Sequence, residues 1–511
     1  MTSSQKQWIE SPRKNPRIFR FIRWVLNVSV GHETAMTKPK YTPRGYQTYI
    51  LDRVSENQET PLLLELDCGL GKRFITHQIV AEKFPNTAII IVVHSSSSLV
   101  ETVDYLKGEY GGLEDDLGEL SSRVRSGFRK LNLKEKRVIV ATPQVLASTL
   151  EKDPSVFDRF KIVLVNEVDT LVRRAGGRTA LIFPWPTLLM YLKDKWIIGM
   201  SGTLRDDHAV FTKEQVEIRD ELSTLKQYIP GAKVISMEDL YGTDIEDFLE
   251  PTLLTVSKVN DQKIRSISKV LDELIRTTRT EIMNELQEDG NLDMVEGDSR
   301  RVHLLLERLP VSDELKGRYS SLLMLRKYVY AMPPKQFLRM FYGDYIKHYF
   351  NVSDLRRALP TTSSKVTRVL KIAKEHKKTL VLTSYLEMVS QTQEILEKSK
   401  LNVLTITGQT KNKGEVLRSF RDDADQQVLV MSPVGERDLD IPHAEVMVVC
   451  DSINTIKTMY QKFKRTRGGL VILLAYSGTS EERKIDRLMN TILKRYPWST
   501  AILDSVGEKL G

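Results

Sequence analysis

The chain has 511 residues, of which 41% are hydrophobic and 28% are charged, as in an ordinary globular protein with room for two or three domains. Its two cysteines, Cys68 and Cys450, supply neither a disulfide framework nor zinc-ligand spacing. This favours an intracellular protein over a secreted one. No run of 18 apolar residues occurs, so we expect no membrane-spanning helix.

The formal net charge of +9 is unevenly distributed along the chain. Residues 300–378 hold 18 Lys/Arg against 6 Asp/Glu, a local net charge of +12, whereas residues 255–299 hold 6 against 10, a net charge of −4. A basic block beside an acidic one is typical of a surface that binds polyphosphate. The alternative is a solvated helical face with no partner, which clustering over this length makes the weaker interpretation.

Residues 17–30 (RIFRFIRWVLNVSV) form a basic and apolar segment near the N-terminus. A signal peptide or a membrane-surface helix would have such a composition. However, Arg20 and Arg23 interrupt the apolar run, and no small-residue cleavage site follows it. Translation from Met36 would remove the segment altogether. We favour a basic, disordered tail over residues 1–40.

From residue 41 onward, short apolar runs alternate with amphipathic helical stretches, a pattern that predicts a parallel sheet wound with helices. The apolar runs of the first α/β domain, 41–250, lie at 61–66, 87–93, 137–141, 161–165 and 196–200. Long helical patterns at 262–287, 313–331 and 334–350 then predict a helical insert over residues 251–362. The alternation returns in a second α/β domain, 363–511, with apolar runs at 379–384, 402–407, 427–432, 445–450 and 470–475.

The segment Asp67-Cys68-Gly69-Leu70-Gly71-Lys72-Arg73 follows the first apolar run and precedes a helix. Glycines let backbone N–H groups approach a phosphate, the lysine neutralises its charge, and the helix N-terminus adds its dipole. The segment therefore predicts a phosphate-binding loop. The alternative is that the loop is retained only as a turn between strand and helix, in which case its glycines serve the fold and bind no phosphate.

Further motifs follow in a fixed order along the chain. They are Arg44-Gly45-Tyr46-Gln47, Ala141-Thr142-Pro143-Gln144, Ser201-Gly202-Thr203, Leu382-Thr383-Ser384-Tyr385, Gly408-Gln409-Thr410, the segment 434–442 (VGERDLDIP) and the segment 461–467 (QKFKRTR). In this order they resemble the motifs of superfamily 2 helicases, above all the archaeal Hef and FANCM helicases, with RIG-I-like and Dicer helicases as relatives. The resemblance covers about residues 41–490. It implies a P-loop NTPase fold of two RecA-like parallel-sheet lobes with a helical insert between them.

The resemblance also assigns roles to particular residues. Nucleotide would contact Gln47, Gly69, Gly71, Lys72 and Arg73. Glu167 would correspond to the catalytic base and Arg465 to the first arginine finger. The nucleic-acid backbone would contact Ser96, Ser97, Thr142, Gln144, Thr383 and Gln409. At Ser95–Ser98 the chain has four serines where the family has Pro-Thr-Lys-Pro, so one positive charge is missing. Serines can bond phosphate oxygens, and a plain polar loop without nucleic-acid contact is an equal alternative.

Three departures fall on the catalytic chemistry of the family. Arg73 replaces the Ser/Thr whose hydroxyl holds Mg²⁺, Asn166 replaces the metal-orienting Asp, and Gly468 stands where the second arginine finger is expected. An amide is a poorer ligand than a carboxylate for a hard cation, and charge neutralisation is central to phosphoryl transfer. We therefore expect ATP to be at most a weak ligand, Mg²⁺ to be poorly bound, and Glu167 to be idle, with Arg73 paired to Glu167 in the metal position.

The predicted insert interleaves basic and aromatic residues over 316–347, a composition that suits backbone tracking and base stacking on nucleic acid. Each aromatic taken singly is more often part of a helical core. The basic residues that we expect to contact nucleic acid are Arg326, Lys327, Arg339, Arg356 and Arg357. The histidines show no metal-ligand spacing, and we expect no metal site.

These expectations combine into a DNA-binding pseudo-helicase, cytoplasmic and associated with the nucleoid, that recognises branched or forked DNA in repair or recombination. The Hef resemblance implies a separate XPF-like nuclease as a partner. We further expect charge pairs, with Arg73 and Glu167 as the leading candidates, to hold the cleft between the lobes closed. An active ATP-dependent helicase or translocase, a factor that binds double-stranded RNA and a purely structural subunit are the alternatives.

Overall fold

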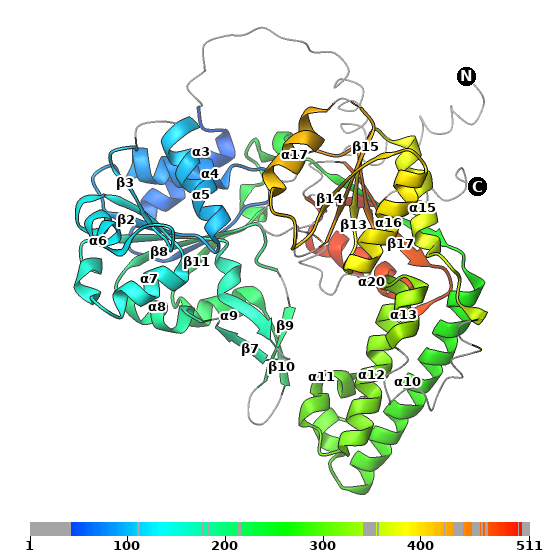
Figure 1. Ribbon diagram of the computed structural model, residues 1–511. Helices are drawn as coiled ribbons and strands as arrows, with labels where there is room; N and C mark the ends of the chain where they lie inside the picture. Colours follow the sequence, from blue (N-terminus) through cyan, green and yellow to red (C-terminus); the bar gives the residue numbers. More distant parts are fainter. Residues whose placement is uncertain are drawn as a thin grey trace. The chain divides into compact units, whose positions relative to one another are not determined.

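The computed structural model describes residues 42–502, except 110–112, 176–177, 182, 206, 212–215, 341–353, 355–356, 424, 433–442, 452–459, 461–462, 465–468 and 499. The predicted tail over residues 1–40 lies outside this range. Two seven-stranded parallel sheets dominate the described residues, as the repeated alternation of apolar runs and helices predicted (Figure 1). None of the helices within the described ranges combines the length and apolarity that a membrane span requires.

The first lobe is built on a sheet with strand order β11-β1-β8-β5-β2-β4-β3. Its strands are β1 (Leu62–Glu65), β2 (Ile89–Val92), β3 (Leu117–Leu120), β4 (Val138–Ala141), β5 (Ile162–Asn166), β8 (Trp196–Ser201) and β11 (Lys233–Ile235). Its helices are α3 (Gly45–Glu56), α4 (Lys72–Gln78), α5 (Ser96–Asp104), α6 (Ser126–Glu135), α7 (Pro143–Leu150), α8 (Trp185–Tyr191) and α9 (Glu221–Tyr228).

Both faces of this sheet are covered by helices, which explains its unbroken apolar strands. Leu62 and Leu64 pack with α3, α4 and α5 on one face, whereas Leu63 between them packs with α6 to α9 on the other. Two antiparallel ribbons accompany the lobe, β6 (Val172–Ala175) with β7 (Arg178–Leu181) and β9 (Asp207–Phe211) with β10 (Val216–Asp220).

The second lobe has a sheet with strand order β14-β15-β13-β16-β17-β12-β18. Its strands are β12 (Thr252–Val259), β13 (Lys378–Leu382), β14 (Asn402–Ile406), β15 (Gln427–Met431), β16 (Val446–Val449), β17 (Leu470–Tyr476) and β18 (Thr500–Ile502). Its helices include α15 (Ser364–Glu375), α16 (Leu386–Lys398), α17 (Lys413–Asp422) and α20 (Ser480–Arg495).

Strand β12 corrects the predicted domain boundaries. Residues 252–259 were assigned to the helical insert, but β12 pairs in parallel with β17 from Leu253–Leu470 to Val259–Tyr476. The second lobe therefore takes one strand from before the insert, and the insert begins after residue 259. The sequence concealed this arrangement because a pairing between segments on opposite sides of the insert leaves no local signal.

The insert contains α10 (Gln262–Glu288), α11 (Val302–Leu305), α12 (Asp313–Ala331) and α13 (Pro334–Met340). The predicted helices at 262–287 and 313–331 are confirmed, and the predicted helix at 334–350 is described only as far as 340. Buried residues recur along α10 at helical spacing, namely Ile264, Ile267, Leu271, Ile275, Ile282 and Leu286. They join one hydrophobic core with α12, α15 and α16, so the insert packs on the second lobe.

Candidate nucleotide and nucleic-acid site

The phosphate-binding loop has the backbone that its glycines predicted. Gly69 and Gly71 both have φ of +85°, in the left-handed region that glycine adopts without strain. A Cβ at Gly71 would lie 2.6 Å from Nε2 of Gln47. That amide and the Tyr46 hydroxyl both donate to the carbonyl of Leu70, at 3.3 and 2.9 Å. Gln47 therefore holds the loop, while its contact with nucleotide stays a prediction.

Lys72 begins helix α4 and faces a carboxylate of its own lobe. Its Nζ donates to the carbonyl of Leu66 at 3.2 Å and lies 3.6 Å from Oε1 of Glu167. Burial, the largest single effect, disfavours the charged lysine, but Glu167, Cys68, Asp67 and Asp169 together outweigh it, so the pKa of Lys72 is raised. Glu167 has φ of 56°, a left-handed conformation that is uncommon for glutamate and is found at functional sites.

The expected pair between Arg73 and Glu167 is wrong. Arg73 forms its ion pair with Glu101 of α5, and Glu167 is paired instead with Lys72. One step along α4 turns the side chain by about 100°, which carries Arg73 away from β5 and toward α5. Because all of these residues belong to the first lobe, none of their pairs can hold the two lobes together.

Asn166 ends strand β5 at the position of the metal-orienting carboxylate. Its Oδ1 is buried and has no hydrogen-bond partner within the part of the chain that the structure describes. Together, Asn166 and Arg73 offer one amide oxygen and a guanidinium, a donor set that does not fit Mg²⁺, which prefers carboxylate, hydroxyl and water oxygens. Across the described residues, no group of three His, Cys, Asp or Glu side chains is placed to hold a metal ion.

A third charged residue of the loop, Asp67, was missed in the sequence. It is 1% exposed, and its Oδ1 accepts a hydrogen bond from the backbone N–H of Cys68 at 2.7 Å. Its Oδ2 lies 3.1 Å from Nζ of Lys464 in the second lobe, an ion-pair distance without hydrogen-bond geometry. Lys464 also donates to the carbonyl of Glu250 at 3.0 Å. The signal was a carboxylate inside a loop that is expected to bind anions.

Lys464 lies one residue before Arg465, the expected arginine finger. Arg465 itself, like Gly468 and the segment 434–442, lies outside the described residues. What the structure establishes at this motif is that a lysine of the second lobe reaches the phosphate-binding loop of the first.

The Ser201-Gly202-Thr203 motif connects the two lobes at another point. The Ser201 hydroxyl donates to Asp169 at 2.7 Å, and the Thr203 hydroxyl lies 2.7 Å from that of Tyr496, just beyond α20. Next to it, Arg495 donates to the carbonyl of Arg205 at 2.8 Å. The motif thus contacts both the segment after β5 and the second lobe.

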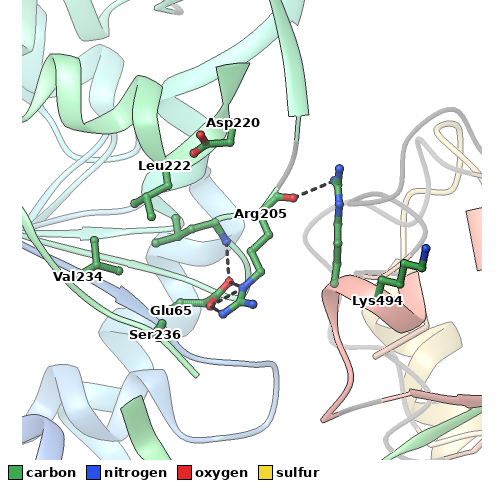
Figure 2. A pocket seen from close by; sticks show the side chains of 9 residues that line it. Glu65, Arg205, Asp220, Leu222, Val234, Ser236 and Lys494 are labelled. Atoms are coloured by element: carbon green, nitrogen blue, oxygen red, sulfur yellow. Dashed lines mark hydrogen bonds and ion pairs between the residues drawn. The ribbon is translucent and has the colours of Figure 1, made fainter. Parts of the chain in front are cut away.

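A pocket of about 400 Å³ opens beside this contact. Arg205 lies against Glu65 at its floor, with its guanidinium hydrogen-bonded to the carboxylate at 2.6 to 2.8 Å (Figure 2). The ring of Trp498 packs on the guanidinium, with its centroid 4.5 Å from Cζ of Arg205. The remaining lining residues are Leu204, Asp220, Leu222, Val234, Ser236, Lys494 and Arg495. Arg205 pairs with both Glu65 and Glu238, so its guanidinium is already engaged and is not available to bind an anion in the pocket.

The residues expected to contact the nucleic-acid backbone follow the carboxyl ends of the strands, where open α/β sheets bind ligands. Ser96 and Ser97 after β2, Gln144 after β4 and Gln409 after β14 are exposed. Thr142 is buried before α7. Thr383 is buried after β13, and its hydroxyl lies 3.4 Å from Asp451. The buried threonines shape this edge of the sheets, while the exposed residues are available to a ligand.

The basic residues expected in the insert differ in their surroundings. Arg326 pairs with Asp272 at 3.1 Å, and the exposed Arg357 pairs with Asp354 at 3.4 Å. Lys327 and Arg339 are exposed, and Arg356 lies outside the described residues. Among the aromatics, Tyr319, Tyr330 and Phe337 are buried in the insert core, as expected for each taken singly.

Two sequence families match the chain. The family described as the type III restriction enzyme res subunit matches residues 40–206, and the helicase conserved C-terminal domain matches residues 364–469. A Methanocaldococcus jannaschii protein named as an ATP-dependent RNA helicase is 20% identical over 487 residues, 88% of this chain and 60% of that protein. The chain therefore spans less than two thirds of this relative's length.

Among solved structures, the Pyrococcus furiosus Hef helicase domain is similar with a TM-score of 0.56 and 16% identity, over 87% of this chain and 98% of that domain. S. cerevisiae Dbp5 bound to RNA and ADP BeF3 gives a TM-score of 0.48 and 12% identity, over 91% of each chain. The Hef likeness concerns the fold, and the two family matches fall on the two lobes. The chain therefore shares the two-lobed RecA-like fold of that helicase domain, as the order of its motifs predicted, and each lobe matches one of the two families.

Proposed function

We propose that this protein is a nucleic-acid-binding pseudo-helicase that binds DNA, with branched or forked DNA favoured, and that hydrolyses ATP at background rate. The buried pair between Asp67 and Lys464 is the observation that carries the proposal. It places a carboxylate inside the phosphate-binding loop and neutralises it with a lysine of the other lobe. In an active helicase, nucleotide phosphates draw the lobes together; here the two lobes supply both charges themselves.

The electrostatics of the loop support weak nucleotide binding. A phosphate that enters the loop would meet the Asp67 carboxylate, and it would have to compete with Glu167 for Lys72. Separating the buried pair of Asp67 and Lys464 leaves a desolvated charge, and breaking a buried ion pair by removing one partner typically costs about 3–5 kcal/mol. Without a carboxylate at Asn166 or a hydroxyl at Arg73, no bound metal offsets that cost.

DNA as the ligand rests on the resemblance to the Hef helicase domain and on the basic block of the insert. Lys327 and Arg339 are exposed on α12 and α13, and exposed cations on helices are suited to phosphate contacts. A separate structure-specific nuclease as partner, and work in repair or recombination, are proposals that rest on the Hef resemblance.

The test of this function is the ATPase rate of the purified protein with Mg²⁺, with and without forked DNA, beside a Lys72→Ala variant. We expect both proteins to hydrolyse ATP at the same background rate under both conditions. Turnover that DNA raises tenfold and that Lys72→Ala abolishes would show an active ATP-dependent helicase instead.

RNA binding is the second candidate, because the M. jannaschii relative carries the name of an RNA helicase. A gel-shift panel of forks, four-way junctions, single strands and duplex RNA, with duplex DNA and duplex RNA as competitors, distinguishes the two. We expect the DNA fork to bind best and duplex RNA to compete poorly. A preference for duplex RNA would favour the second candidate.

A further inference from the structure

Helix α12 of the insert and helix α20 of the second lobe, which are distant in sequence, are tied together by polar contacts. The Tyr330 hydroxyl lies 2.8 Å from that of Ser480 at the start of α20. Asp272 of α10 binds a cation of each helix, Arg326 at 3.1 Å and Arg483 at 3.5 Å. These contacts bring the neighbouring basic side chains of the two helices together.

Three of those basic side chains form what we call the α12–α20 seam: Lys327 on α12, and Lys484 and Arg487 on α20. Lys327 and Arg487 are exposed and Lys484 is half-buried. No ion pair with an acidic side chain joins any of the three among the described residues. Lys327 instead lies over the ring of Tyr385, 5.9 Å from its centroid.

Two acids close to the seam are already engaged. Asp272 is shared between Arg326 and Arg483. Glu481 is buried and pairs with the equally buried Lys365 at 2.7 Å. Because these carboxylates are committed to other cations, the seam keeps a net positive charge.

The charge of the seam affects its most buried member. Burial lowers the pKa of Lys484, and the cations of Lys327, Arg326 and Arg487 lower it further, against the opposing effect of Glu481. An anion that binds beside such a lysine stabilises its charged form, because the anion offsets both the desolvation and the repulsion from the neighbouring cations.

We propose that Lys327, Lys484 and Arg487 form a phosphate-binding seam that holds a nucleic-acid backbone where the insert meets the second lobe. This inference rests on the proposed function and names a site for the nucleic acid. The position of Tyr385 supports a path for the nucleic-acid backbone. Tyr385 follows Thr383 and Ser384 at the carboxyl end of β13, and its ring centroid lies 5.6 Å from that of Tyr328 on α12. A strand that follows this edge of the second lobe reaches Lys327 next.

The test compares two triple variants that remove the same charge. The seam variant is Lys327→Gln, Lys484→Gln and Arg487→Gln. The control is Lys398→Gln, Arg418→Gln and Arg421→Gln, which are exposed cations of α16 and α17 in the same lobe, outside the basic block 300–378. Affinity for a labelled DNA fork is measured from low to moderate salt, and thermal unfolding verifies that both variants fold.

We expect the seam variant to lose at least tenfold in affinity, and its log–log salt slope to fall by about 2 to 3, since each duplex phosphate contact contributes about 0.9. The control should keep the slope of the wild type. Lys484→Arg, which retains the charge with little change in size, should bind as the wild type does and would exclude a packing defect.

Equal slopes for the seam variant and the control, with a wild type that binds, would overturn the seam and leave nucleic-acid binding intact. A wild type that binds none of the nucleic acids in the panel would overturn the proposed function and the seam with it. A loss of DNA affinity in the single variant Lys484→Arg would also count against the seam. It would show that binding depends on the shape of this side chain even where its charge is retained.

Discussion

Asp67 and Lys464 form a buried ion pair between the phosphate-binding loop of the first lobe and the second lobe, with Oδ2 and Nζ 3.1 Å apart and the two side chains 1% and 5% exposed. They come from opposite ends of the chain's helicase-like region, and each stands in a motif for which the resemblance implies a contact with nucleotide. The pair replaces the charge pairing between Arg73 and Glu167 that we expected to hold the cleft closed. Unlike that expected pairing, it joins one lobe to the other.

Removing one partner of this pair should destabilise the protein. Lys464→Met leaves the Asp67 carboxylate buried and unpaired, and we expect a loss of about 3 kcal/mol in the free energy of unfolding. The double variant Asp67→Leu with Lys464→Met should lose less than the sum of the two single variants. Urea unfolding measures all three. Additive losses would mean that the two side chains do not interact in solution.

Affinity for forked DNA should not depend on nucleotide, because the lobes are joined without it. A titration of labelled fork at fixed salt with ATP, with ADP and with neither should give one affinity. In the same titration, the affinity of Lys464→Met should depend on nucleotide, unlike that of the wild type. That result would show that the pair of Asp67 and Lys464 makes the wild-type affinity independent of nucleotide. A shift beyond about tenfold (1.4 kcal/mol) on adding ATP to the wild type would establish coupling between the nucleotide and DNA sites, and would contradict the expectation that the lobes are joined without nucleotide.

Restoring the family residues at the metal position should recover little ATPase activity. The variant Arg73→Thr with Asn166→Asp supplies a hydroxyl and a carboxylate, but Asp67 still repels the phosphates and Gly468 still lacks a finger side chain. Steady-state turnover with Mg²⁺ and DNA measures the outcome. Full activity in the double variant would show that metal binding alone had been lost.

The pair between Lys365 and Glu481 should contribute strongly to the stability of the second lobe. Lys365 is fully buried and also donates to the carbonyl of Cys450 at 2.6 Å. Lys365→Met leaves Glu481 buried and uncompensated, with an expected loss of about 3–5 kcal/mol in the free energy of unfolding. The exposed Lys371→Met serves as the control and should change it by no more than about 0.5 kcal/mol. A similar, small effect in both variants would contradict this role.

DNA binding should weaken as the pH rises through the lowered pKa of Lys484. Below that pKa the lysine is charged and attracts phosphate, and above it the charge is lost. Burial and the nearby Lys327 cation place this transition at a lower pH than for an ordinary lysine. Bound DNA favours the charged form and so raises the pKa. Fork affinity against pH at fixed salt should therefore decline earlier for the wild type than for Lys484→Arg. Superimposable profiles would exclude Lys484 from the interface.

Local pattern in the sequence was enough to predict most of the fold. The helix predicted over 262–287 runs from Gln262 to Glu288, because its apolar residues recur with helical spacing. The apolar runs became strands, since a strand buried on both faces reads as an unbroken hydrophobic segment. Gly69 and Gly71 adopt the left-handed backbone that a phosphate-binding loop requires. In each case the determining interactions lie within a few residues of one another.

What the tertiary structure alone decided are the pairings between distant segments. The place of β12 in the second sheet depends on a hydrogen-bonded partner, β17, that lies beyond the whole insert in the chain. Arg73 binds Glu101 because Lys72 already faces Glu167, a choice set by the rotation of α4 against its neighbours. The pair of Asp67 with Lys464 and the cations of the α12–α20 seam are likewise products of packing. A charge carries no record in the sequence of its partner; only the packing of distant elements brings two side chains within the few ångströms over which they interact.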